Sequence, residues 1–278
     1  MIVNVIGLGL IGGSFCKAVK QKTVHTCHGW DINPDVLNKA LREGAIDCTG
    51  ENLSLADLTI VCLYPEAAIR FLLDNCANFK AGSIVVDACG VKAAVVEAVS
   101  RPLHESGVIF IGGHPMAGRE FSGFDYSSAD LFEKASLILT PSESTPPDKL
   151  DAVRELAQAL SFKKVVCTTA EEHDAIIAYT SQLAHVVSNA YVKSPTLSRQ
   201  LGFSAGSFKD LTRVAKLNED MWTSLFLLNR APLLYELETL AAHLEEYRKA
   251  LEAGDEAHIR SLLRDGRILK ERSLEENF

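Results

Sequence analysis

A histidine follows a predicted buried strand near the middle of the chain. Residues 108–111 are β-branched or aromatic, and Gly112, Gly113, His114 and Pro115 come next. Ligands of an open α/β sheet bind beyond the carboxyl ends of its strands. We therefore predict that His114 lies in an active site, where a side chain that titrates near neutral pH is useful. The alternative is a histidine in an ordinary glycine-rich turn.

A glycine-rich motif stands at the start of the chain. Strand-like residues 2–6 lead into a GxGxxG run, and a helical pattern follows. Gly7 permits a tight turn, Gly9 lets backbone amides approach a pyrophosphate, and Gly12 lets the helix pack closely on the strand. The amino end of that helix would face the phosphates. The motif predicts a dinucleotide-binding loop made of Gly7, Leu8, Gly9, Leu10, Ile11 and Gly12.

Asp31 predicts which dinucleotide is bound, because it ends the second strand-like run, residues 24–30. A carboxylate there accepts hydrogen bonds from the ribose hydroxyls and repels a 2′-phosphate. This favours NAD over NADP; the alternative is that Asp31 only caps the helix beginning near Pro34. The ends of two later strands, 58–63 and 83–87, predict further cofactor contacts at Leu63, Tyr64, Pro65, Cys89 and Gly90.

The second half of the chain carries polar side chains at helical spacing. Thr169 and Glu172 form a capping box that opens a predicted helix to about residue 193. This helix is apolar on most faces but has a polar stripe of Ser181, His185 and Ser188 or Asn189. The stripe is either a set of satisfied core groups or part of a site.

Arg213 follows Asp210 by three residues in a further helical segment, residues 207–215. The two side chains would share one face of that helix. They form either an intrahelical ion pair or an oriented guanidinium that binds a carboxylate ligand.

Alternating strands and helices must position these residues. The alternation continues to residue 168 and then gives way to helices only, one of them running from Pro232 to about residue 253. It predicts a Rossmann-type, doubly wound parallel sheet at residues 1–169, followed by an all-α domain at 170–278. The Pro/Ser-rich run at 141–147 is interpreted as a loop inside the first domain. Excess apolar surface on the small helical domain suggests a homodimer.

Composition restricts the class of protein. The 278 residues are 47% hydrophobic and carry a formal net charge of −8, which argues against nucleic-acid binding. Seven cysteines are scattered without CxxC spacing, which is typical of reduced thiols and predicts a cytoplasmic protein without a metal site. No run approaches the roughly 20 apolar residues of a membrane span, and no signal peptide is expected at the amino terminus.

Several segments together resemble the prephenate/arogenate dehydrogenases of tyrosine biosynthesis. The resemblance covers nearly the whole chain, and the segments that carry it are GLGLIGGS at 7–14, Asp31, GGHPMAGRE at 112–120, Glu172-His173-Asp174, His185, FKDLTRVA at 208–215 and Trp222. The family joins a Rossmann domain to a helical dimerisation domain, with the active site between them. It oxidises a ring carbinol with NAD(P)+ while a carboxylate leaves as CO₂.

The resemblance also implies residue roles. His114 would accept the ring hydroxyl proton, Arg213 would bind a substrate carboxylate and His185 would contact the substrate side chain. Substrate contacts or support are further implied for Glu120, Arg119, Ser181, Asp210 and Trp222. The expected activity is NAD-dependent prephenate dehydrogenase, and no metal is needed because decarboxylation drives the step.

Three departures from the family pattern leave alternatives open. Cys89-Gly90 replaces a Gly-Ser whose serine positions the reacting hydroxyl, Gln182 replaces a second histidine, and Arg119 replaces a small polar residue. We expect neither an ACT regulatory domain nor a preceding chorismate mutase segment. Arogenate or dual specificity is one alternative activity. Another small Rossmann oxidoreductase, such as a β-hydroxyacid dehydrogenase or imine reductase, or a non-catalytic NAD-binding protein is less favoured.

Overall fold

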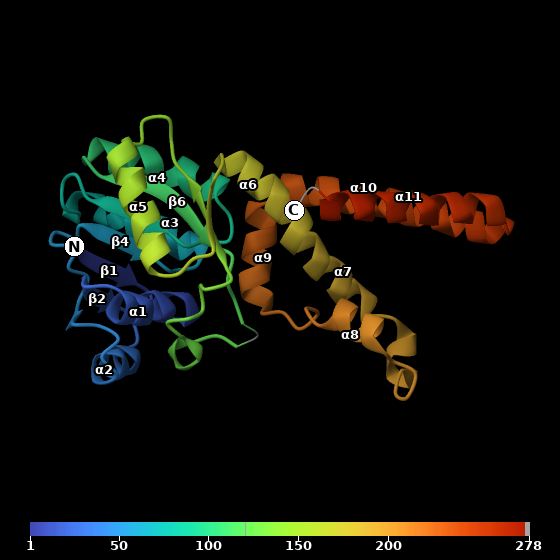
Figure 1. The fold of residues 1–278 in the computed structure, drawn as a ribbon, viewed down its shortest axis with the longest axis horizontal. Helices are drawn as coiled ribbons and strands as arrows, with labels where there is room; N and C mark the ends of the chain where they lie inside the picture. The colour runs from blue at the N-terminus through green and yellow to red at the C-terminus, as the bar shows by residue number, and fades with distance from the viewer. Residues whose placement is uncertain (120, 276–278) are drawn as a thin grey trace.

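The computed structural model describes residues 1–119 and 121–275. One part is a sheet covered by helices on both faces, and the other is built of helices alone (Figure 1). Glu120 lies outside the described residues, so the role predicted for it is not placed.

Eight strands form one sheet in the order β3-β2-β1-β4-β5-β6-β7-β8. Their bounds are β1 (Ile2–Ile6), β2 (Thr26–Trp30), β3 (Cys48–Thr49), β4 (Leu58–Val61), β5 (Ile84–Asp87), β6 (Ile109–Pro115), β7 (Ser136–Thr140) and β8 (Lys164–Cys167). The order in which successive strands are added to the sheet reverses between β1 and β4, and dinucleotides bind at this point in folds of this type. The predicted doubly wound fold is confirmed.

One strand pair departs from the predicted parallel arrangement. β7 pairs antiparallel with β6, and β8 then runs parallel to β7. Parallel neighbours need a crossover of a dozen or more residues, usually a helix. Among the described residues between β6 and β7, the only helical element is the 3₁₀ turn Phe124–Tyr126, so no helix carries the chain across the sheet and it returns beside β6. This pairing also lengthens β6: His114 lies within the strand, opposite Ile138, rather than after it.

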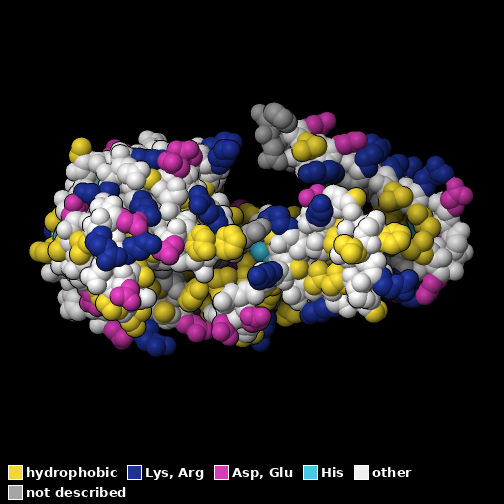
Figure 2. Space-filling view, turned by 90° about the horizontal axis from the view of Figure 1, so that it is seen from below, with side chains coloured by type: hydrophobic (Ala, Val, Ile, Leu, Met, Phe, Trp, Pro, Cys, Tyr) yellow, Lys and Arg dark blue, Asp and Glu magenta, His cyan; other side chains and the backbone are white. Residues whose placement is uncertain are grey.

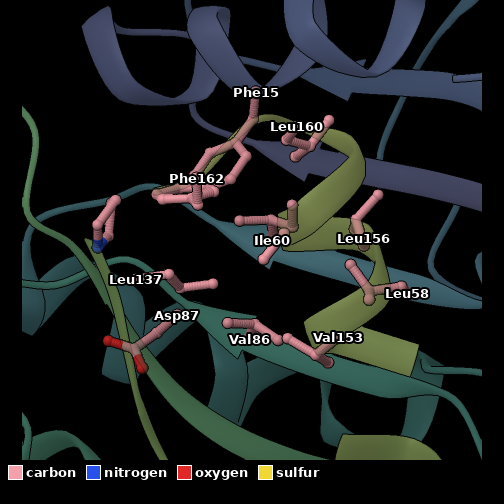
Figure 3. Close-up of a pocket in the computed structure, with 12 residues that line it drawn as sticks. Phe15, Leu58, Ile60, Val86, Asp87, Leu137, Val153, Leu156, Leu160 and Phe162 are labelled. Atoms are coloured by element: carbon pink, nitrogen blue, oxygen red, sulfur yellow. The ribbon is translucent and has the colours of Figure 1, made fainter. Parts of the chain in front are cut away.

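Five helices cover the sheet. They are α1 (Leu10–Lys22), α2 (Pro34–Arg42), α3 (Pro65–Asn75), α4 (Ala93–Glu105) and α5 (Pro147–Ala159). Buried apolar residues of α1 and α5 pack on one face of the sheet, and those of α3 and α4 pack on the other. Both faces of the sheet are therefore buried from solvent, as an almost wholly parallel sheet requires. A cavity of about 20 Å³ remains on the α5 side, lined by apolar side chains and Asp87 (Figure 3).

The second part of the chain is helical. Its segments are α6 (Ala170–Ile177), a π-helical segment (Ala178–Leu183), α7 (Ala184–Tyr191), a 3₁₀ turn (Pro195–Arg199), α8 (Gly206–Thr212), α9 (Glu219–Leu228), α10 (Arg230–Ala253) and α11 (Glu256–Glu275). The single helix predicted to residue 193 thus continues through a π-helical segment. Such segments are frequent at functional sites. α9, which carries Trp222, was not predicted as an element.

The α10–α11 hairpin projects away from the sheet, while α7 and α8 extend in another direction (Figure 1). Large apolar side chains on the hairpin are more than a third exposed: Leu234, Tyr235, Leu237, Leu244, Leu251, Leu263, Leu269 and Leu274. Figure 2 shows hydrophobic side chains gathered over the helical half of the molecule. No helix within residues 1–119 and 121–275 combines the length and apolarity needed to cross a membrane.

Candidate active site

The loop between β1 and α1 has the geometry of a pyrophosphate cradle. Gly7 adopts φ +87°, and a Cβ on Gly12 would overlap the carbonyl oxygen of Gly7. A Cβ on Gly9 would meet nothing within 4 Å, and Gly9 caps α1 without any side-chain hydrogen bond. The first amides of α1 are therefore left for an anionic ligand. The glycines fit a dinucleotide for the reasons predicted from their spacing.

Asp31 is bound to this loop. Its Oδ2 accepts a hydrogen bond from the Leu8 amide at 2.7 Å, and its Oδ1 accepts one from the Asn33 amide at 2.8 Å. The cap of α2 is Asn33, whose side chain accepts from the Asp35 amide. The capping alternative for Asp31 is therefore wrong. A carboxylate held here opposes a 2′-phosphate and favours NAD.

The remaining predicted cofactor residues follow the carboxyl ends of the neighbouring strands β4 and β5. Tyr64 is largely exposed and Pro65 begins α3, whereas Cys89 is buried. The Cys89 thiol donates to the Leu63 carbonyl oxygen at 3.5 Å, and burial raises its pKa well above the usual value. The thiol is thus protonated and already has a partner.

The two glycines that precede His114 in β6 pack closely against neighbouring strands. A Cβ on Gly113 would lie 2.5 Å from the Asp87 carbonyl oxygen, and one on Gly112 would overlap the Thr140 hydroxyl. Both glycines are therefore required by close approach. Gly118, by contrast, has no positive φ, and a Cβ there would meet nothing within 4 Å among the described residues.

A buried ion pair supports the same strand. The Lys92 ammonium pairs with Asp87 Oδ2 and donates to the Gly113 carbonyl oxygen at 2.6 Å, and both charged side chains are 0% exposed. The Asp87 carboxylate also accepts from the amides of Gly113, at 3.1 Å, and Cys89, at 3.0 Å. The pair thus connects the end of β5 to the backbone immediately before His114.

His114 belongs to a hydrogen-bonded series of side chains. Its Nδ1 lies 2.9 Å from Nε2 of His173 on α6, and Nδ1 of His173 lies 2.7 Å from Oδ1 of Asp174. Burial, His173 and the charge of Lys92, in that order, lower the pKa of His114 well below the usual 6.5. His114 is therefore neutral at pH 7, as a general base must be.

α9 lies between the sheet and the other helices of the second part (Figure 1). A Cβ on Gly90 would lie 3.6 Å from the Leu225 side chain and 3.9 Å from His114 Nε2. The Ser224 hydroxyl of α9 lies 3.4 Å from Glu66 Oε1 on α3. Nε2 of His114, which has no hydrogen-bond partner within residues 1–119 and 121–275, therefore lies near both Gly90 and Leu225 of α9.

His185 and Trp222 connect α7 to α9. Their ring centroids are 3.9 Å apart, and His185 Nδ1 lies 3.2 Å from the Val214 carbonyl oxygen. Asn189 donates to the next carbonyl, that of Ala215, at 3.2 Å. Two members of the predicted polar stripe thus hold the segment that follows Arg213. Burial is the main reason that the pKa of His185 is lowered.

The structure does not bring Asp210 and Arg213 together. Both are exposed, and within the described residues neither takes part in an ion pair of 4.0 Å or less. The expectation that Asp210 orients the guanidinium by direct contact is therefore not met. Ser181 is half-buried in the π-helical segment. Arg119 donates to the Tyr126 carbonyl oxygen at 3.1 Å, within the β6–β7 connection.

Sequence reasoning assigned no role to several buried polar residues. His173 and Asp174 appeared only as part of a family motif, and Lys92 and Asp87 were not singled out. Asn229 donates both to the Asp174 carbonyl oxygen, at 2.9 Å, and to Gln182 Oε1, at 2.8 Å. A signal was present, because charged residues inside otherwise buried segments must have partners. Their partners lie too far along the chain to be read from spacing.

Comparison with known proteins agrees with this geometry. Residues 15–166 match the nucleotide-binding domain of prephenate dehydrogenase, and residues 169–265 match the prephenate dehydrogenase dimerization domain. A prephenate dehydrogenase from Lactococcus lactis is 31% identical over 97% of this chain and 76% of its own length. A cyclohexadienyl dehydrogenase from Zymomonas mobilis is 29% identical over 91% and 89%.

Solved structures agree as well. The crystal structure of prephenate dehydrogenase from A. aeolicus with hydroxyphenyl propionate and NAD+ superposes with a TM-score of 0.87 at 27% identity, covering 98% of both chains. Synechocystis arogenate dehydrogenase gives 0.84 at 26% identity, covering 98% of this chain and 100% of its own. The fold and site define an NAD-dependent dehydrogenase with a helical second domain. The chain belongs to the prephenate dehydrogenase family.

Proposed function

We propose that this chain catalyses the NAD-dependent oxidative decarboxylation of prephenate to 4-hydroxyphenylpyruvate. The observation that carries the proposal is the neutral His114 at the end of β6, with its Nε2 close to Gly90. NAD+ bound on the β1–α1 loop supplies the hydride acceptor. His114 takes the proton of the ring hydroxyl while the ring carboxylate leaves as CO₂ and the ring becomes aromatic.

The helical part would bind the rest of the substrate. An exposed Arg213 without an ion-pair partner in the described residues is available to a carboxylate, which guanidinium groups bind through two parallel hydrogen bonds. His185, packed against Trp222, would contact the substrate side chain. Ser181, Asp210 and Arg119 stay predictions as substrate-binding residues.

We also propose a domain boundary, an oligomeric state and a cellular compartment for this chain. We place the domain boundary at residues 169 and 170, between the end of β8 and the start of α6. The exposed apolar side chains of the α10–α11 hairpin support a homodimer formed through the helical domain. Seven free cysteines support a reducing compartment and hence the cytoplasm. The net charge of −8 supports a small-molecule substrate rather than a nucleic acid.

Arogenate is the second candidate substrate, and it differs from prephenate only in an amino group in place of the side-chain keto group. Relatives of both kinds support it, because a cyclohexadienyl dehydrogenase and an arogenate dehydrogenase are among the similar proteins. The test is nicotinamide reduction with prephenate or arogenate, each offered with NAD+ or NADP+. Turnover with prephenate and NAD+ is expected. No turnover in any of the four combinations would refute the proposed activity.

Two variants test the assigned roles. His114→Ala should lower kcat by about 10²- to 10⁴-fold, the usual contribution of a general base, while NAD+ still binds. Arg213→Met should raise KM by roughly 10- to 100-fold, because a charge-assisted hydrogen bond contributes about 1.5–3 kcal/mol. Lys216→Met is the matched control, since Lys216 is an exposed cation three residues away. Equal KM values for the two methionine variants would exclude Arg213 as the carboxylate site.

A further inference from the structure

We propose that His173 and Asp174 are positioning residues that fix the tautomer of His114 and stabilise its protonated form. The proposal rests on the activity given above for His114. Both side chains are buried, with His173 1% and Asp174 2% exposed, although a carboxylate and an imidazole are rarely fully buried without a reason. They reach His114 through the two hydrogen bonds of 2.7 and 2.9 Å already described.

The direction of these hydrogen bonds follows from the backbone. Asp174 Oδ1 accepts from the Lys92 amide at 2.8 Å, and Oδ2 accepts from the Ala93 amide at 2.9 Å. Amides only donate, so both carboxylate oxygens are acceptors. The proton between His173 and Asp174 must therefore sit on His173 Nδ1.

The assignment then passes to His114. A neutral imidazole has one N–H and one acceptor nitrogen, so Nε2 of His173 is an acceptor. The contact to His114 is a hydrogen bond only if His114 Nδ1 carries the proton. His114 Nε2 is then left with its lone pair, and this is the nitrogen beside Gly90. Asp174 thus determines, through His173, that the basic nitrogen of His114 is the one near Gly90.

The same series acts during the reaction. The substrate O–H bond breaks, an N–H bond forms at His114 Nε2, and the hydride leaves for NAD+. The resulting imidazolium keeps its Nδ1–H on His173, which in turn donates to the Asp174 carboxylate. The Lys92 ammonium, at the start of α4, disfavours the protonated form of His114, and the negative charge of Asp174 counteracts this effect. Asp87 on β5 in turn pairs with Lys92. α9 places the apolar Leu225 near Gly90.

The position of Asp174 also gives it a structural role, and the test must separate the two. Its carboxylate satisfies two amides at the start of α4, so Asp174→Asn would weaken that end of the helix as well as remove the charge. His173→Gln leaves the α4 contacts in place and breaks only the series to His114. Glu172→Gln is the matched control, because Glu172 is exposed and lies beside His173 on α6.

The first measurement is the tautomer of His114 in the full-length protein, read from ¹⁵N chemical shifts of ¹⁵N-histidine-labelled samples without cofactor. His114 is assigned by comparison with His114→Ala. The proton is expected on Nδ1 in the wild type and in Glu172→Gln, and redistributed towards Nε2 in Asp174→Asn and His173→Gln. An Nε2–H tautomer in the wild type would overturn the proposal, whether or not prephenate is turned over.

The second measurement is the pH dependence of kcat and KM with prephenate and NAD+. Asp174→Asn and His173→Gln should each lower kcat by about 10²- to 10⁴-fold with KM changed less than about threefold. The acidic limb of the profile should also move, which a purely structural role would not cause. Wild-type kcat in a folded His173→Gln protein would refute the proposal even if Asp174→Asn fails to fold. Absence of wild-type turnover would instead refute the activity and leave the tautomer measurement decisive.

Discussion

The buried pair of Lys92 and Asp87 allows a quantitative prediction. Lys92→Met removes the ammonium but keeps a chain of similar length, so the change is loss of charge rather than loss of volume. Asp87 then retains its bonds to two amides but has no counter-ion while 0% exposed. Breaking a buried pair from one side costs about 3–5 kcal/mol, because the remaining charge is uncompensated.

The cavity next to Asp87 bears on this magnitude. At about 20 Å³ it has room for one water, but apart from Asp87 its lining is apolar (Figure 3). A buried water needs two to four polar partners, so water is not expected to rehydrate the carboxylate there. The cost should therefore not fall below the stated range. At roughly 2–4 °C per kcal/mol, the melting temperature should drop by roughly 6–20 °C.

The assay is thermal unfolding followed by circular dichroism, with two companion variants. Lys80→Met breaks an exposed pair with Asp57, whose side chains are 48% and 37% exposed, and should cost less than about 1 kcal/mol. Asp87→Asn combined with Lys92→Met leaves no unpaired charge and should be more stable than Lys92→Met alone. The reasoning is refuted if Lys92→Met is no more destabilising than Lys80→Met, or if the double variant is the least stable.

Four further predictions concern the glycines and the dependence on pH. Gly12→Ala should lower the melting temperature, because its Cβ would overlap a backbone oxygen. Gly9→Ala, whose Cβ would meet nothing within 4 Å, should keep its melting temperature and lose NAD+ affinity measured by calorimetry. Gly90→Ser should fold normally, since its nearest neighbour lies at 3.6 Å, and should change kcat because the hydroxyl would come close to His114; an unchanged kcat would contradict this placement. The lowered pKa of His114 keeps the base neutral down to acidic pH, so kcat/KM should hold its neutral-pH value until the pH is well below 6.5; a midpoint at 6.5 or above would contradict the burial argument. Because unfolded His114 binds a proton below 6.5 and the folded residue does not, stability should decrease as the pH falls through that value.

Local patterns in the sequence were enough for the nucleotide-binding half. The GxGxxG loop, the position of Asp31 and the alternation of strands and helices depend on neighbouring residues and on the fixed periods of helix and strand. The antiparallel direction of β7 was not predicted, because it follows from the missing crossover helix among the described residues between β6 and β7 and not from the residues of the strand itself. The π-helical segment was missed for a similar reason: its residues have an ordinary helical pattern.

The sequence alone indicated a histidine at the carboxyl end of a strand in a dinucleotide-binding domain, and a guanidinium and a second histidine on later helices. Only the tertiary structure decided what surrounds His114. His173 is 59 residues away in sequence, and Asp174 fixes both the start of α4 and the tautomer of the base. Residue types and spacing describe which groups can titrate. Which nitrogen carries the proton is decided by hydrogen bonds between distant segments, and these form only when the helical domain packs against the sheet.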